Sequence, residues 1–253
     1  MCFSEEVLMS PYHHLKALAE QFPDTWKLID TFRMEQDNIP DWPDWCLLPK
    51  SAWQAIVAKE YNVSQLATRQ IKEASYLAAI AAWRYEQGIY RFKRDVYKKL
   101  IHDSKKNKLN PRIFYQLPEW SIYIKTPHLT WNNVPLAGFW CHLEWDMHKK
   151  IPILKLMLNT FTLQEISLPL DARVLNNIYK PHTSNYKSVK DINYHSTLFA
   201  MVCLVYCICK CSASIGNKGK HPEKTQPRLF KGMFKLFPAA QPTLWHIDSA
   251  AAT

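Results

Sequence analysis

The sequence predicts an α+β fold: a helical N-terminal half packed on a small antiparallel β-meander, with a buried Cys-rich helix near the C-terminus. Apolar and polar residues alternate over residues 120–125 and again over 139–146, which is typical of strands that pack one face on a core. Small and apolar residues recur at helical spacing over residues 64–85. Residues 198–209 form an unbroken apolar run of 12, which is too short to span a bilayer and suits a buried helix.

The N-terminal third reads as short helices joined by a rigid loop. Residues 11–36 carry helical spacing that Pro23 interrupts, so we expect two helices there. Residues 39–49 contain three prolines, which forbid a helix and favour an extended, packed loop. Residues 51–58 can then form a short helix.

The rest of the chain alternates between the two kinds of element. Leu117 to Asp146 reads as a β-hairpin whose turn is Trp131 to Pro135. Further strands are expected over 89–92, 151–158 and 163–170, and further helices over 94–102, 172–179 and 191–211. We therefore expect one α+β domain over residues 1–211, followed by a basic, irregular tail over 212–253 with one docking element at 243–247.

The positive charge of the chain is concentrated in two blocks. The net charge is +10, and residues 84–112 hold 10 basic residues against 3 acidic ones, while residues 180–235 hold 10 against 2. Such blocks predict a polyanionic partner, namely RNA or the ribosome, although a solvated lysine-rich face would give the same pattern. The candidate RNA-binding residues are Lys98, Lys99, Lys105, Lys106 and Lys108.

Four segments occur in an order that resembles a known family: Trp42–Pro49, Ala81–Phe92, Leu117–Pro127 and Gly138–Asp146. The chain is similar in these segments to the second-described type V-A anti-CRISPR family and its plasmid- and phage-borne relatives. The resemblance implies a non-catalytic inhibitor that recognises the nascent N-terminal peptide of the type V-A Cas nuclease and lowers the amount of its mRNA. It implies action in the cytoplasm of a bacterial host cell, without a membrane partner.

The ten tryptophans suggest where such a peptide would bind. Several of them alternate with polar side chains, and a hydrophobic floor with polar anchors is typical of a peptide groove. The alternative is that the aromatic residues only fill the core. The candidate peptide-binding residues are Trp42, Trp45, Trp83, Arg84, Tyr90, Glu119, Trp120, Trp140 and Glu144.

Two further clusters of side chains could form a catalytic or metal site, and each also has a purely structural interpretation. His142, Glu144 and Asp146 share one strand face and could hold Mg²⁺ in a nuclease, or hydrogen-bond neighbouring loops. The cysteines from Cys203 to Cys211 lie on one predicted helix, which presents only two thiols on a face, so core packing is favoured over zinc. We therefore expect no enzyme activity, metal or cofactor. The N-terminus lacks the basic region of a signal peptide, which predicts a cytoplasmic chain with free thiols.

Three functional hypotheses follow from these patterns. The first is the anti-CRISPR inhibitor, the second is an RNA-binding regulatory protein of a mobile element, and the third is a metal-dependent nuclease that uses Glu144 and Asp146. Salt dependence separates the first two, because binding to phosphates weakens steeply with salt, whereas binding of a peptide in a groove does not.

Overall fold

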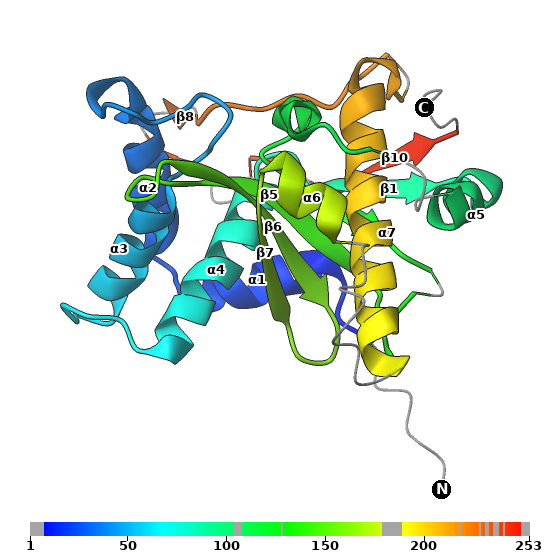
Figure 1. Ribbon diagram of the computed structural model, residues 1–253. Coiled ribbons are helices and arrows are strands. Elements are labelled where there is room, and N and C mark those ends of the chain that lie inside the picture. The colour runs from blue at the N-terminus through cyan, green and yellow to red at the C-terminus, as the bar shows by residue number, and fades with distance from the viewer. Residues whose placement is uncertain are drawn as a thin grey trace, which may run out of the picture.

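The computed structural model describes residues 8–103, 108–127, 129–178, 189–217, 219–227, 229–230, 233–234, 238–239 and 241–248. A central mixed sheet carries the four N-terminal helices on one face and the long helix α7 on the other (Figure 1). The helices are α1 (Pro11–Gln21), α2 (Thr25–Met34), α3 (Lys50–Glu60), α4 (Thr68–Trp83), α5 (Arg94–Asp103), α6 (Ala172–Asn177) and α7 (Val189–Cys211). The predicted α+β fold, with its helical N-terminal half and its Cys-rich C-terminal helix, is confirmed.

The main sheet has six strands in the order β10-β1-β2-β5-β6-β7. The strands are β1 (Gly88–Phe92), β2 (Ser121–Lys125), β5 (Gly138–Asp146), β6 (Ile151–Asn159), β7 (Gln164–Pro169) and β10 (Thr243–Ile247). Strands β2, β5, β6 and β7 form the expected antiparallel meander. Strand β1 pairs in parallel with both β2 and β10, so the sheet is mixed and larger than the predicted meander.

The segment between β2 and β5 is more than a simple turn. It contains a separate two-stranded sheet, β3 (Thr130–Trp131) with β4 (Val134–Pro135). Asn132 and Asn133 between them have φ angles of 50° and 65°. Asn tolerates this left-handed region better than most residues, which is the reason that the pair can make a tight hairpin turn. Another two-stranded sheet consists of β8 (Leu229–Phe230) and β9 (Met233–Phe234).

Alternating side chains of β5 serve two separate cores. Phe139, Cys141 and Leu143 point into the core beneath α7, while Trp140 points into the core beneath the N-terminal helices. Every second residue of a strand faces the same side, so nine residues of β5 suffice to contact both layers. The sheet is therefore the wall that separates the two cores.

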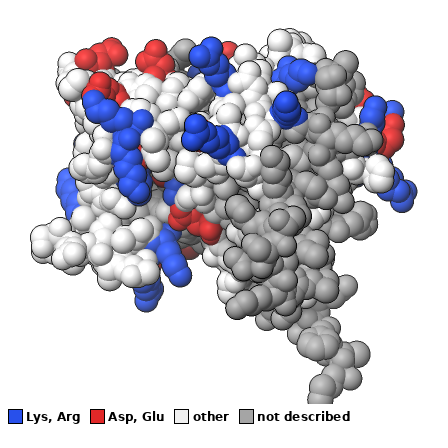
Figure 2. Space-filling model, viewed as in Figure 1, with Lys and Arg blue, Asp and Glu red and all other residues white. Residues whose placement is uncertain are grey.

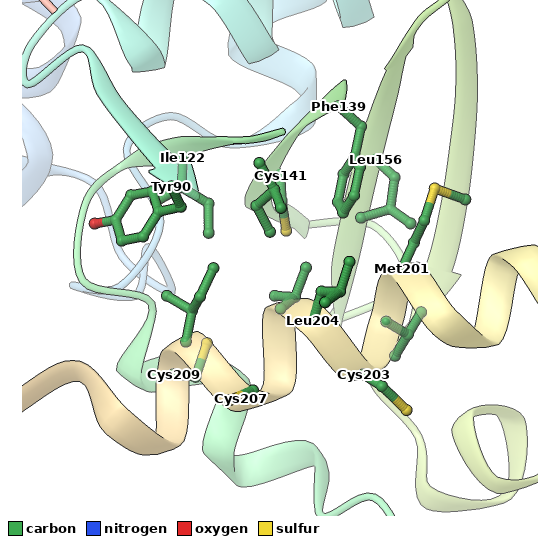
Figure 3. Packing of buried hydrophobic residues seen from close by; sticks show 14 of the residues in the cluster. Tyr90, Ile122, Phe139, Cys141, Leu156, Met201, Cys203, Leu204, Cys207 and Cys209 are labelled. Carbon is green, nitrogen blue, oxygen red and sulfur yellow. The ribbon is translucent and has the colours of Figure 1, made fainter. Parts of the chain in front are cut away.

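Helix α7 is a core helix. Residues Tyr194–Ser214 are long and apolar enough to cross a membrane by length and composition, but 67% of the apolar window is buried inside the protein. Met201, Leu204 and Cys209 point toward the sheet, and Cys203 and Cys207 lie on other sides of the helix (Figure 3). The helix is hydrophobic all round because it is covered on several sides.

The C-terminal segment returns to the sheet. Trp245 and Ile247 of β10 are buried, and the residues between and beside them are partly or fully exposed. The expected docking element at residues 243–247 is thus an edge strand beside β1. The division of the chain at residue 211 stays a prediction.

Candidate functional site

The predicted aromatic groove is not an open surface in the described part of the protein. Eight of its nine residues are buried, and only Trp45 is partly exposed. Trp42, Trp83, Trp120 and Trp140 lie in the core under the N-terminal helices, whereas Tyr90 lies in the core under α7. Trp42 lies in a loop and Trp83 in α4, while Tyr90 and Trp140 lie on opposite faces of a sheet that is covered on both sides, so these rings do not line one open groove. That some of these residues contact a peptide stays a prediction.

Arg84 is held inside the N-terminal core. Its guanidinium forms an ion pair with Asp30, which also accepts a hydrogen bond from the Tyr85 hydroxyl. The same guanidinium lies over the ring of Trp26, 5.3 Å from its centroid. An arginine with no exposed side-chain surface is stable only with such partners, so its role here is to join α2 to the end of α4.

Glu119 is a buried anchor for the C-terminal segment. Its Oε1 accepts a hydrogen bond of 2.8 Å from the indole N–H of Trp245 in β10. Burial raises the pKa of Glu119 to about 8, although the hydrogen bonds from Trp245 and Tyr90 act against that rise. Burial also raises the pKa of the neighbouring Glu86, whose Oε1 accepts from the backbone N–H of Thr225 at 2.7 Å. The carboxyl groups of Glu119 and Glu86, both with a raised pKa, therefore accept hydrogen bonds from Trp245 and Thr225 of the C-terminal segment.

Glu144 belongs to a buried ion-pair network on the other part of the sheet. Lys155 Nζ lies 3.4 Å from Glu144 Oε2 and also forms an ion pair with Glu165, while His142 Nε2 lies 3.6 Å from Glu144 Oε1. Asp146 accepts a hydrogen bond of 3.1 Å from the backbone N–H of Lys149 and lies 3.6 Å from Lys50 Nζ. The two carboxylates of the nuclease hypothesis are thus occupied by internal cations and backbone.

No group of three or more His, Cys, Asp or Glu side chains able to hold a metal ion occurs among the described residues. The six described cysteines are buried thiols, and the Sγ atoms of Cys207 and Cys211 lie 3.9 Å apart. Burial raises the pKa of Cys203 to about 12, so its thiol is protonated at neutral pH. The burial of the α7 thiols agrees with core packing of this helix.

The first open surface lies around the loop that follows α2, and we call it the Trp42 groove. It is a hollow of about 500 Å³ whose lining includes Trp42, Trp145, Asp37, Asp41 and Asp44. The Trp42 indole N–H donates to the carbonyl of Cys46 at 2.9 Å, which fixes the loop to the core. Asp41 has a φ of 62°, a left-handed conformation that Asp accepts more readily than most residues. The lining also includes Lys150, whose Nζ lies 3.0 Å from Asp41 Oδ2. The groove therefore combines two tryptophans with two carboxylates, Asp37 and Asp44, that have no ion-pair partner among the described residues.

The second open surface lies at the other end of the sheet, and we call it the α5 groove. It is a hollow of about 990 Å³ between α5, the ends of β1 and β10, Pro127, Leu129 and Ser196 of α7. Lys98 of the predicted RNA-binding set lines it, while Lys99 and Lys108 are exposed outside its lining. Lys105 and Lys106 lie outside the described residues. Figure 2 shows Lys and Arg side chains at several separate places on the face in view.

Several groove residues were not singled out from the sequence. In the Trp42 groove they are Asp37, Asp41 and Asp44, and in the α5 groove they are Arg91, Lys93, Arg94 and His246. The spacing of Arg94, Lys98 and His102 at intervals of four was the available signal, because it places all three on one helix face. No local sequence pattern indicated that β10 contributes a residue to the α5 groove.

The fold of the chain is shared with a solved structure. It is similar to the crystal structure of AcrVA2, with a TM-score of 0.63 and 16% sequence identity over 94% of this chain and 84% of that chain. At this identity the likeness shows a shared fold. None of the curated proteins matches the chain.

The family follows from the sequence. The model of the AcrVA2-like family, described as the anti-CRISPR type V subtype A2 family, matches residues 90–251. The chain therefore belongs to the anti-CRISPR type V subtype A2 family. Membership supports an anti-CRISPR inhibitor with a Cas-related target.

Proposed function

We propose that the protein inhibits a type V-A CRISPR system by binding the nascent N-terminal peptide of the Cas nuclease, and that the nuclease message is lost as a result. The family match over residues 90–251 carries this proposal. The protein acts in the cytoplasm of the bacterial host, where the nascent chain emerges. It recognises and does not cleave, which agrees with the internal partners of Glu144 and Asp146.

The Trp42 groove is the surface that we assign to the peptide. The partly exposed Trp145 supplies apolar contact area, and the exposed Asp37 and Asp44 favour a segment that carries Lys or Arg side chains, whereas Asp41 already pairs with Lys150 of the same lining. The ring of Trp42 also faces the guanidinium of Arg33, 5.8 Å from the ring centroid. Arg33 in turn donates to Gln226 at 3.1 Å, so the groove is in contact with the C-terminal segment.

A reporter in bacterial cells tests the dependence on translation. The first codons of a type V-A nuclease gene are fused to a fluorescent protein and coexpressed with the inhibitor, and the message is quantified. Synonymous recoding, which changes the RNA but keeps the peptide, should leave the loss of message intact. A compensated frameshift, which keeps nearly all nucleotides but changes the peptide, should protect the message. Continued loss of the frameshifted message would contradict peptide recognition.

Peptide binding to the groove can be measured directly with the synthetic N-terminal peptide and purified protein. Asp37 is exposed at the groove rim, so Asp37→Lys should weaken binding without disturbing the core. Glu20→Lys on the exposed face of α1 makes the same charge change away from the groove and should bind like the wild type. Equal affinity of the two variants would remove the Trp42 groove from the proposal.

The RNA-binding regulator stays as a second candidate, because the α5 groove is basic. A nuclease would instead cut purified RNA with Mg²⁺. Such cleavage by the wild type, lost in the variant Glu144→Gln/Asp146→Asn, would contradict a mechanism of recognition alone.

A further inference from the structure

The α5 groove collects cations from three elements of the chain. Its basic lining residues are Arg91, Lys93, Arg94, Lys98, His102 and His246. All six are exposed, so their charged or polar ends meet solvent in the hollow. Asp248 is the one acidic residue among the described residues that line it.

Local geometry explains why the cations converge. Arg94, Lys98 and His102 lie four residues apart on α5, which stacks them along one helix face at about 5.4 Å per turn. On the sheet, Arg91 of β1 and His246 of β10 are direct neighbours in the parallel register. Each lies between residues whose side chains are more deeply buried, so the pleat directs these two outward together.

The positive charge in the groove is not compensated by described residues. No described carboxylate lies within ion-pair distance of Arg91, Lys93, Arg94 or Lys98, whereas the buried Arg84 and Lys155 each have an acidic partner. Four permanent cations that share one hollow repel one another, and an anionic ligand would relieve that repulsion. The groove therefore has the charge that favours binding of a polyanion.

The remaining lining suits a nucleic acid better than an acidic peptide. Ile101, Pro127 and Leu129 offer an apolar side against which sugars and bases can pack, and Ser196 offers a hydroxyl. A phosphodiester chain carries a charge at every residue, which matches a column of cations repeated at each helical turn. A hollow walled by several elements admits a single strand that can bend into it, whereas a rigid duplex would meet only the rim.

We propose that the α5 groove binds the phosphodiester backbone of single-stranded RNA through Arg91, Lys93, Arg94 and Lys98. This site lies apart from the Trp42 groove and requires no particular nuclease sequence. It would hold the protein on a message or on ribosomal RNA while the other groove engages a nascent chain.

Fluorescence anisotropy with a labelled single-stranded RNA of about 12 nucleotides tests the proposal on the purified full chain. The wild type should bind, and the logarithm of its affinity should fall linearly with the logarithm of the salt concentration. Arg94→Glu/Lys98→Glu should lower the affinity at least about tenfold and reduce the salt slope by roughly 1.4, the value for two lost phosphate contacts. The RNA should contain no nuclease sequence, so that the result is independent of the proposed anti-CRISPR target.

The matched control is Lys27→Glu/Lys72→Glu, because both lysines are exposed on helices, α2 and α4, that do not line the groove. This variant has the same net charge as the groove variant and should retain wild-type affinity within about twofold. Equal weakening in the two variants, or no binding at low salt, would overturn the proposal. A labelled oligo-glutamate peptide provides a further test. If this peptide binds the wild type more tightly than RNA does, and Arg94→Glu/Lys98→Glu abolishes that binding, the groove is a site for acidic peptides and the proposal is overturned. A negative result for RNA binding would not change the interpretation of the reporter experiment. A negative result in the reporter experiment would likewise not change the interpretation of RNA binding.

Discussion

The indole N–H of Trp245 donates to Oε1 of Glu119 at 2.8 Å, and this bond joins residues that lie 126 positions apart. Glu119 lies two residues before β2, the first strand of the meander, and Trp245 lies in the edge strand β10. The bond therefore ties the returning C-terminal segment to the centre of the fold, and the first two predictions concern it.

The pH dependence of stability should carry the signature of Glu119. Burial raises its pKa from 4.5 to about 8, so the native state binds the proton more tightly than the unfolded state does. The corresponding stability is fully present below pH 4.5 and is lost as the pH rises toward about 8. Glu119→Gln keeps the shape and cannot ionise, so its stability relative to the wild type should rise over this range. Urea unfolding at several pH values measures the difference, and a difference that is constant with pH would contradict it.

Gly88→Ala should destabilise the protein through the same carboxyl group. A Cβ at residue 88 would lie 2.0 Å from Oε2 of Glu119, whose position is fixed by Trp245. We expect a loss of about 1–3 kcal/mol in the free energy of unfolding, as is usual for overpacking. In a Glu119→Ala background the clash is absent, so the same change should cost much less. Equal costs in the two backgrounds would show that Glu119 is not the obstacle.

Lys155→Met should be among the most damaging substitutions in the sheet. Burial opposes the charge of Lys155, but Glu144 and Glu165 outweigh that effect and raise its pKa. Without this cation the Glu144 carboxylate would be left buried with no permanent positive charge, at a cost of about 3–5 kcal/mol. Adding Glu144→Gln should recover part of the loss, which a double-mutant cycle would detect.

An exposed ion pair provides the control for this prediction. Lys150 and Asp41 are 3.0 Å apart, and their side chains are 69% and 63% exposed. Lys150→Met should change the free energy of unfolding by less than about 1 kcal/mol, because water screens such pairs. A similar cost for the two lysine substitutions would mean that the buried network contributes no more than a surface pair.

The thiols of the native protein should react slowly. Burial raises the pKa of Cys203 to about 12 and also raises the pKa of Cys46, Cys141 and Cys209. In a Cys2→Ser background, a thiol reagent at neutral pH should label the six described cysteines only after urea is added. Rapid labelling without urea would show that α7 opens in the native state.

The sequence by itself determined the elements of secondary structure and the class of fold. The spacing in α4 and the alternation in β5 are local patterns with periods of 3.6 and 2 residues, so they can be read without knowing any partner. The prolines around Trp42 and the turn residues Asn132 and Asn133 are equally local signals. The family resemblance rested on such segments, and the family match bears it out.

Only the tertiary structure decided which polar residues are buried and which strands are neighbours. Arg84 and Glu119 were expected at a surface, since charged groups are costly to bury without partners. Their partners, Asp30 and Trp245, lie 54 and 126 positions away along the chain. No local sequence pattern predicts a partner that lies so far away along the chain.

The α5 groove depends on the same kind of long-range information. Lys98 could be identified from the charge of its segment, but the hollow exists because β10 lies beside β1 and brings His246 next to Arg91. Parallel pairing leaves no turn between the two strands that would reveal it in the sequence. Helix periodicity and charge are properties of neighbouring residues, whereas a groove is a property of elements that meet only after the chain has folded.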